Sequence, residues 1–242
     1  MRTPPERDSP FLQKGCLMTN LPTKAAVLWT GGKDCALAMH IAMQSGFDVT
    51  CLVTFAPRDA HFRSHSLDLM RAQADAIDLP WLRMEIAEPY FDSYKAAIVQ
   101  LRDEHGIEVV VTGDIAEVDG YPNWVRQCAE GSGVEVATPL WGLSRAEMLD
   151  ALVRGSFRVI ITAVKLSALG DTWVGREIDR ATADELLSLH QTRGIDACGE
   201  NGEYHTMVID APFFARPIRV STIGASKDTE RAYAEFAPSV IP

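Results

Sequence analysis

A short apolar segment that stops at two glycines and passes directly into a helix constrains this fold more than any other feature. Residues 25–30 (AAVLWT) are apolar, Gly31 and Gly32 follow, and the segment from Lys33 to Gly46 is rich in alanine and other helix-forming residues. Glycine permits positive φ angles and close backbone approach, so it can turn successive N–H groups toward one point. We therefore expect a buried parallel strand, an anion-binding turn and a helix, in that order.

The rest of the first half repeats this alternation. Apolar runs predict strands at 49–55, 81–86 and 107–114, and apolar residues at helical spacing predict helices at 67–77 and 91–101. Strands that alternate with helices of this length form βαβ units. The first half is therefore expected to be an α/β unit, a parallel sheet with flanking helices.

The second half is less regular, and its helices are recognised by their first turns. Ser144 and Glu147 are three residues apart, as in a capping box. Thr182 and Glu185 have the same spacing and predict a second capping box. We expect a helix to begin at each of these pairs.

Strand-like segments at 157–164 and 207–210 complete the pattern of the second half. We expect a flexible N-terminal tail over 1–22, an ATP-binding domain over 23–135 and a smaller C-terminal α/β substrate domain over 136–242. The boundary near residue 135 rests on the loss of strict alternation there.

Composition excludes several classes of protein. The 242 residues carry a net charge of −10, which argues against a partner nucleic acid bound through bulk electrostatics. No apolar run approaches the ~20 residues that span a bilayer, so we expect no membrane association. The N-terminus lacks a signal-peptide core, and the five cysteines form no CxxC pair. Free thiols and a cytoplasmic location are expected.

The glycine turn carries its own counter-charges. Lys33 supplies a cation for phosphoryl oxygens, and Asp34 supplies the carboxylate oxygen that Mg²⁺ prefers. Neither the GxxxxGK[ST] loop nor the GxGxxG fingerprint is present. The alternative is an ordinary glycine turn between a strand and a helix.

Residues 30–35 (TGGKDC) resemble the SGGKDS loop of the PP-loop ATP pyrophosphatases, within the adenine nucleotide alpha-hydrolase superfamily. This resemblance implies a Rossmann-like (HUP-type) sheet and an enzyme that cleaves ATP between the α and β phosphates. Thr30 and Cys35 depart from the loop, and a thiol is only a weak donor. The nucleotide contacts implied are Thr30, Gly31, Gly32, Lys33, Asp34, Cys35, Thr54, Gly113 and Asp114.

A second cluster narrows the choice of family. Residues 199–206 (GENGEYHT) resemble the GE-G-GE-[FY]-x-T signature of the diphthine–ammonia ligases. Other segments resemble the same family: GDI at 113–115, TPLW at 138–141 and WVGR at 173–176. The spacing of residues over 65–80 also matches the family. The resemblance covers about residues 24–215 and implies that ATP, with Mg²⁺, adenylates a carboxylate, which ammonia then converts to an amide.

The chemistry of amide formation fits the same residues. Lys33, with a metal at Asp34, can spread the charge that develops as pyrophosphate leaves. Ammonia must arrive unprotonated, and Glu200 and Glu203 can bind ammonium and accept its proton, as can His205. The alternative is that these three side chains belong to a solvated polar hairpin.

Two departures from the family bear on the substrate. Residues 117–126 (EVDGYPNWVR) replace a Tyr-Gln-Arg element, although Arg126 remains, and residues 200–205 (ENGEYH) resemble the bacterial branch. The resemblance therefore implies a carboxylic acid that can differ from diphthine, a corrinoid-related acid being one candidate. His61 and His65 are four apart but lack a helix signal and a third ligand, so we do not expect a metal there. The five tryptophans are expected in the core or at interfaces.

Two other functions remain open from the sequence. A PP-loop enzyme that modifies tRNA is disfavoured by the acidic composition and by the lack of CxxC pairs. A non-catalytic ATP-binding sensor of the universal-stress type does not need Lys33, Asp34 or the glutamates. A homodimer is expected only because two-fold dimers are common.

Overall fold

The computed structural model describes residues 22–60, 62–117 and 123–240. Most of the expected N-terminal tail, together with Cys16 and His61, lies outside these ranges. The elements of the first half alternate along the chain: β1 (Lys24–Leu28), α1 (Lys33–Gln44), β2 (Asp48–Ala56), α2 (Leu67–Ile77), β3 (Trp81–Glu85), α3 (Tyr90–His105), β4 (Val109–Val111), α4 (Trp124–Ala129) and β5 (Glu135–Ala137).

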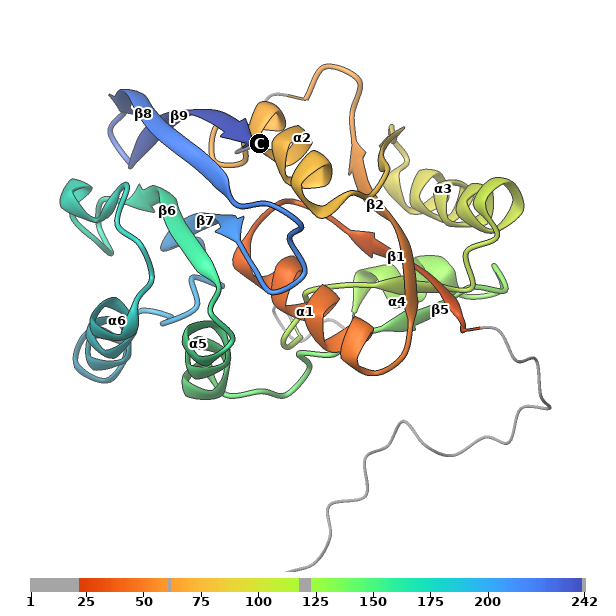
Figure 1. The fold of residues 1–242 in the computed structure, drawn as a ribbon, viewed down its shortest axis with the longest axis horizontal. Coiled ribbons are helices and arrows are strands. Elements are labelled where there is room, and N and C mark those ends of the chain that lie inside the picture. The colour runs from red at the N-terminus through yellow and green to blue at the C-terminus, as the bar shows by residue number, and fades with distance from the viewer. Residues whose placement is uncertain (1–21, 61, 118–122, 241–242) are drawn as a thin grey trace, which may run out of the picture.

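The first five strands form one parallel sheet in the order β3-β2-β1-β4-β5 (Figure 1). This arrangement confirms the expected Rossmann-like sheet with flanking helices. The chain winds outward from β1 to β3 and then returns to β4 on the other side of β1. Ligands of open α/β sheets bind at such a reversal, in the crevice beyond the carboxyl ends of the two strands. The loops after β1 and β4 are therefore adjacent.

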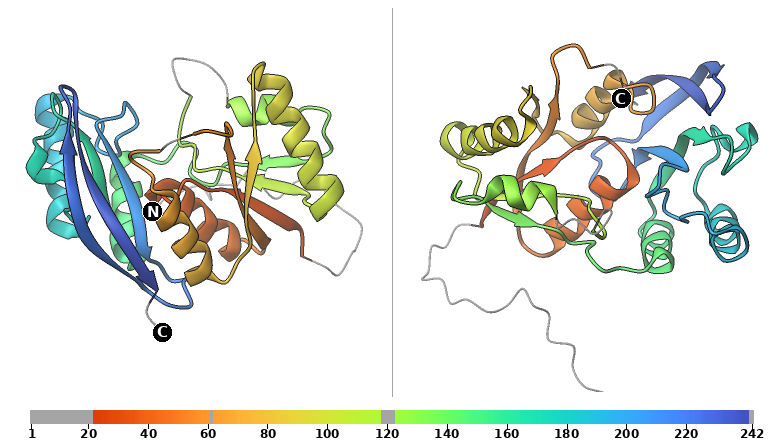
Figure 2. Two further views of the ribbon diagram at one scale, coloured as in Figure 1. Left: turned by 90° about the horizontal axis from the view of Figure 1, so that it is seen from above. Right: turned by 180° about the vertical axis from the view of Figure 1, so that it is seen from behind.

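Both faces of this sheet are buried, which explains its apolar strands. Ala25 and Val27 of β1 belong to a core with α1 and α2, and Ala26 belongs to a separate core with α3 and α4. The first core continues into a second sheet, so α1 and α2 lie between the two sheets (Figure 2). No helix within the described ranges is long and apolar enough to cross a membrane.

The second half forms a four-stranded antiparallel sheet in the order β7-β6-β9-β8, with two helices packed beside it. This matches the expected smaller C-terminal α/β unit, although the boundary near residue 135 stays a prediction. Its elements are α5 (Arg145–Arg154), β6 (Arg158–Lys165), the short 3₁₀ helix η1 (Asp171–Trp173), α6 (Arg180–Arg193), β7 (Tyr204–Asp210), β8 (Ile218–Lys227) and β9 (Arg231–Val240).

One of the two expected capping boxes is present. Ser144 and Glu147 form a complete capping box at the start of α5. The prediction for α6 was wrong, because Asp179 caps this helix by accepting a hydrogen bond from the backbone N–H of Thr182, at 2.8 Å. The helix begins three residues earlier than expected because Asp179 is available there and aspartate is a better N-cap residue than threonine.

A single buried side chain, Gln73 of α2, joins the first strand to the second sheet. Its Oε1 accepts a hydrogen bond from Trp29 Nε1 at 3.0 Å, and its Nε2 donates to Gly31 O at 2.9 Å and to Val208 O at 2.7 Å. The backbone N–H of Val208 also donates to Gly31 O, at 2.9 Å. The loop after β1 is therefore held against β7 by the side-chain amide of Gln73 and by one direct backbone hydrogen bond.

We predict that Gln73→Leu lowers the free energy of unfolding by about 2–5 kcal/mol, because it leaves the Trp29 indole N–H and the Val208 carbonyl buried without partners. Chemical denaturation measures this change, with Gln100→Leu on the exposed face of α3 as the control. A change below 1 kcal/mol for Gln73→Leu contradicts the prediction.

Candidate active site

The loop after β1 is shaped by its two glycines. Gly31 has φ +76°, and a Cβ there lies only 2.3 Å from Gln73 Oε1 and 2.6 Å from the Met207 methyl group. Gly32 is the N-cap residue of α1 and supplies no side-chain cap. The first helical N–H, that of Lys33, donates to Thr206 Oγ1 at 3.1 Å. A bulkier residue at position 31 is therefore excluded by both conformation and space.

The loop after β4 closes on the same helix end. A Cβ on Gly113 lies 2.7 Å from the backbone of both Asp34 and Cys35, so this approach requires glycine. Asp114 accepts hydrogen bonds from Thr112 Oγ1, at 2.7 Å, and from Asn123 Nδ2. Gly113 thus brings β4 against the start of α1, and Asp114 is oriented by its neighbours.

Lys33 and Asp34 are paired with each other. Lys33 is 3% exposed, and its Nζ donates to both carboxylate oxygens of Asp34, at 2.9 and 2.8 Å. Burial disfavours the ammonium ion, but the Asp34 carboxylate outweighs burial and the pKa of Lys33 is raised. An incoming phosphate or metal ion must therefore compete for charges that already neutralise each other.

Cys35 takes part in the turn itself. Its thiol donates to Gly32 O at 3.2 Å and lies 3.8 Å from Thr30 Oγ1, and burial raises its pKa. Cys35, Cys51, Cys128 and Cys198 are all free thiols, as expected.

Two cavities meet at Thr30. The larger, of about 330 Å³, lies at the carboxyl ends of β1, β2 and β4 and is mainly apolar. The smaller, of about 150 Å³, lies over the start of α1. Thr30 lines both, so the glycine turn connects an apolar chamber with a polar one.

Aromatic rings form much of the larger cavity, which we call the aromatic cavity. Trp124 lines it and is 46% exposed, so this tryptophan and Trp141, which is 39% exposed, lie outside the core, and an interface role for them stays a prediction. Its ring packs edge-on against Tyr94, at 6.2 Å between centroids. Thr54 forms part of the floor, but its hydroxyl already donates to Trp29 O at 2.6 Å and accepts from Trp81 Nε1 at 2.9 Å.

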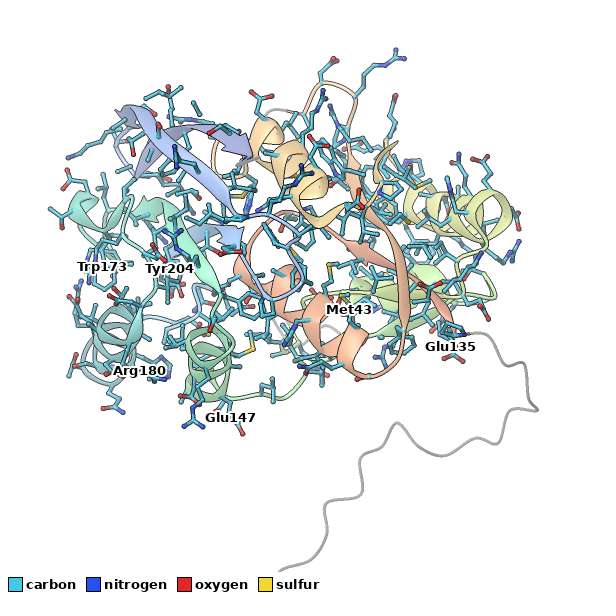
Figure 3. All side chains as sticks on the ribbon, in the orientation of Figure 1. Met43, Glu135, Glu147, Trp173, Arg180 and Tyr204 are labelled. Atoms are coloured by element: carbon cyan, nitrogen blue, oxygen red, sulfur yellow. The ribbon has the colours of Figure 1, made fainter. Side chains whose placement is uncertain are left out.

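The smaller cavity, which we call the polar cavity, combines residues from both halves of the chain. It is lined by Lys33 and Asp34 of α1, by His65 before α2, by Glu200 in the turn before β7 and by His205 of β7. Figure 3 labels Tyr204, which begins β7 and whose ring lies 5.5 Å from Lys33 Nζ. The structure thus brings together residues that are about 170 positions apart in the sequence.

Two of these groups have strongly altered pKa values. Glu200 is exposed at the rim of the polar cavity, yet desolvation by the surrounding protein raises its pKa to about 7; Asp34 adds to the rise and Lys33 opposes it. Desolvation, together with the nearby cations, lowers the pKa of His205 to about 4. Near pH 7, Glu200 is divided between its two forms and His205 is neutral.

Glu203 does not line the polar cavity. It is buried, and its carboxylate accepts hydrogen bonds from Asp196 N at 2.7 Å and from Asn201 N at 3.0 Å and Nδ2 at 3.3 Å. Asp196 in turn binds Arg145 at 2.7 Å. Glu203 therefore holds the turn that presents Glu200, and the two glutamates, which looked equivalent in the sequence, have different surroundings.

The replaced segment 117–126 lies partly outside the described residues. In the described part, Asn123 caps α4 by accepting from Arg126 N at 2.9 Å, and Arg126 donates to Thr138 Oγ1 at 3.0 Å. Arg126 thus ties α4 to the end of β5.

Comparison with known proteins gives two family matches. A model described as the diphthamide synthase N-terminal domain matches residues 23–136, and one described as the C-terminal domain matches residues 145–239. Several vertebrate proteins named diphthine–ammonia ligase are similar over most of their length. The Rattus norvegicus protein is 26% identical and the Bos taurus protein 24% identical, each covering 88% of this chain and 89% of its own.

A solved structure gives a more distant match. It is titled a predicted subunit of tRNA methyltransferase from Methanocaldococcus jannaschii and superposes with a TM-score of 0.43 at 16% identity, over 78% of this chain and 98% of its own. This likeness carries no argument about function.

We predict that replacing Glu203 and replacing Glu200 have different effects on the free energy of unfolding. Glu203→Gln places an amide N–H₂ against backbone N–H groups and should lower the free energy of unfolding by about 1–3 kcal/mol. Glu200→Gln should not lower it, because it removes a carboxyl group whose ionisation the surrounding protein disfavours. Chemical denaturation of both variants checks this, and equal losses contradict it.

We also predict that Glu200 titrates near neutrality. In protein labelled with ¹³C at the glutamate carboxyl groups, one resonance should have a midpoint at about 7 and be missing in Glu200→Gln. Because folding raises this pKa, the group should reduce stability as the pH rises from about 4.5 to 7. A midpoint below 5 refutes the prediction.

Proposed function

This chain belongs to the diphthamide synthase family, and on that premise we propose that it is an ATP-dependent ligase that adenylates a carboxylate and converts it to an amide with ammonia. The observation that supports this most directly is the polar cavity, where a phosphate-binding turn, a lysine and a carboxyl group with a pKa of about 7 lie together. The proposed substrate is a carboxylic acid, and diphthine is one candidate for it.

The two cavities suit the two parts of ATP. The aromatic cavity offers ring faces for the adenine, and Asp114 at its edge offers a carboxylate for the ribose hydroxyls. From Thr30 the triphosphate crosses the Gly31–Gly32 turn and the start of α1, whose dipole and N–H groups favour anions. The β- and γ-phosphates then enter the polar cavity beside Lys33.

Adenylation transfers AMP to the substrate. A carboxylate oxygen bonds to the α-phosphorus, and the bond from this phosphorus to the bridging oxygen breaks, so the electron pair leaves with pyrophosphate. Lys33 Nζ, fixed by Asp34, stabilises this charge inside a desolvated cavity. The acyl-adenylate then carries a leaving group, AMP, that ammonia can displace.

Glu200 suits the second step. Once pyrophosphate has left, its carboxylate can bind ammonium and accept the proton that releases neutral ammonia. The nitrogen attacks the acyl carbon, AMP departs with the electron pair of the broken C–O bond, and the surplus proton on the nitrogen passes to the departing phosphate. Glu203 acts through position, because it holds the turn that carries Glu200.

Asp34 fits a magnesium ion. Mg²⁺ is usually held by one or two carboxylates together with substrate phosphates, and Asp34 offers a partly exposed carboxylate beside the phosphate turn. No group of three or more His, Cys, Asp or Glu suited to a metal occurs among the described residues. When bound, the ion supplies charge neutralisation for the phosphates.

The two other functions have less support. Membership of the diphthamide synthase family favours a ligase over both, and the Lys33–Asp34 pair is not needed by a sensor.

We predict that labelled ATP, incubated with ammonium and a panel of carboxylic acids, yields AMP and pyrophosphate in the presence of an accepted acid. Lys33→Ala should reduce AMP formation by ~100-fold or more, because it removes the charge that stabilises the leaving group. The matched control is Lys165→Ala, whose side chain is exposed. Formation of ADP alone, or full activity in Lys33→Ala, rules out the proposed function.

A further inference from the structure

Two histidines in the polar cavity lie beside the phosphate turn. The rings of His65 and His205 are 5.3 Å apart between centroids and meet edge-to-face at 77°. His65 Cε1 is 3.7 Å from the position of a Cβ on Gly32, so this ring packs directly on the turn. His65 lies in the loop before α2 and His205 lies in β7, and the docking of β7 against the turn brings them together.

One nitrogen of this pair lacks a partner. His65 Nδ1 is buried and has no hydrogen-bond partner within the described ranges. A buried polar atom without a partner costs free energy in the free protein, and a ligand that satisfies it recovers that cost. No hydrogen bond within the protein has to be broken at this nitrogen for a ligand to bind it, and the His65 residue lines the polar cavity.

The charges around the pair indicate the sign of that ligand. Lys33 and Arg231 are the cations that act on His205, and Lys33 acts on His65 as well. Asp34, Cys198, Glu200 and Tyr204 complete the titratable groups of the cavity. Asp34 is already neutralised by Lys33, and the pKa of Glu200 is raised, so the cavity can accept an anion. Both imidazoles have lowered pKa values, so each enters the reaction as a neutral group with one N–H donor.

The position of the two histidines indicates which anion they bind. A nucleotide seated in the aromatic cavity directs its phosphate chain past Thr30 and over Gly32, so its far end lies beside the two rings. We propose that His65 and His205 form a paired imidazole site for the β- and γ-phosphates of ATP and for the pyrophosphate that leaves. This inference rests on the proposed function, and it adds His65, which the sequence analysis considered only as a metal ligand.

The pair supplies hydrogen bonds to phosphoryl oxygens and is not consumed in the reaction. Its N–H donors act on the charge that develops on the pyrophosphate side, and they add to the effect of Lys33. When pyrophosphate leaves, the cavity of about 150 Å³ becomes free for ammonia beside Glu200.

Calorimetric titrations of the full chain with inorganic pyrophosphate, with AMP and with ATP, in the presence of magnesium chloride, test the proposal. The variants are His65→Phe and His205→Phe, which keep a ring and remove both nitrogens. Each should weaken pyrophosphate and ATP binding about tenfold or more and leave AMP binding within about twofold. The control is His105→Phe, at the exposed end of α3, which should bind all three ligands as the parent does.

A second measurement does not depend on the variants folding. The imidazole resonances of His65 and His205 in the unaltered protein should shift on addition of pyrophosphate and stay unchanged with AMP. The inference is overturned if both variants bind pyrophosphate as tightly as the unaltered protein does, or if the resonances respond only to small carboxylates. The ligase proposal stands in either case. Failure of ATP and AMP to bind the unaltered protein overturns both.

Discussion

The attachment of β7 to the loop after β1 is the constraint on which the rest of the site depends. The backbone N–H of Val208 and the side chain of Gln73 both bind Gly31 O, and Thr206 Oγ1 accepts from the first N–H of α1. These bonds join the end of one sheet to the edge of another. Because Glu200 and His205 lie just before and within β7, the same contacts place them over the phosphate-binding turn.

The charges of the polar cavity are balanced before any ligand binds. Lys33 and Asp34 neutralise each other, His205 is neutral near pH 7, and Glu200 is divided between two protonation states. A resting cavity of this kind avoids the cost of an unpaired buried charge. In the proposed reaction these groups would be used in turn by a phosphate, a metal ion and ammonium.

The first half of the fold was predictable because its signals are local. Apolar runs that stop at Gly31 and Gly32 and alternate with helical periods indicate a parallel sheet without knowledge of distant contacts. The hairpin of β8 and β9 was not predicted, although its residues alternate, because exposed antiparallel strands carry a weak apolar signal. The cap of α6 was misplaced because Asp179 and Thr182 are both good N-cap residues.

The glycine turn, with Lys33 and Asp34 beside it, could be predicted from the sequence alone, since glycine conformation and neighbouring charges act over a few residues. Only the tertiary structure decided which glutamate faces the cavity, because Glu200 and Glu203 differ in burial and partners that no local pattern encodes. The same holds for Gln73, Trp124 and His65, whose partners lie far away in the chain. Proximity and desolvation, which set the chemistry of a side chain, are properties of the packed fold.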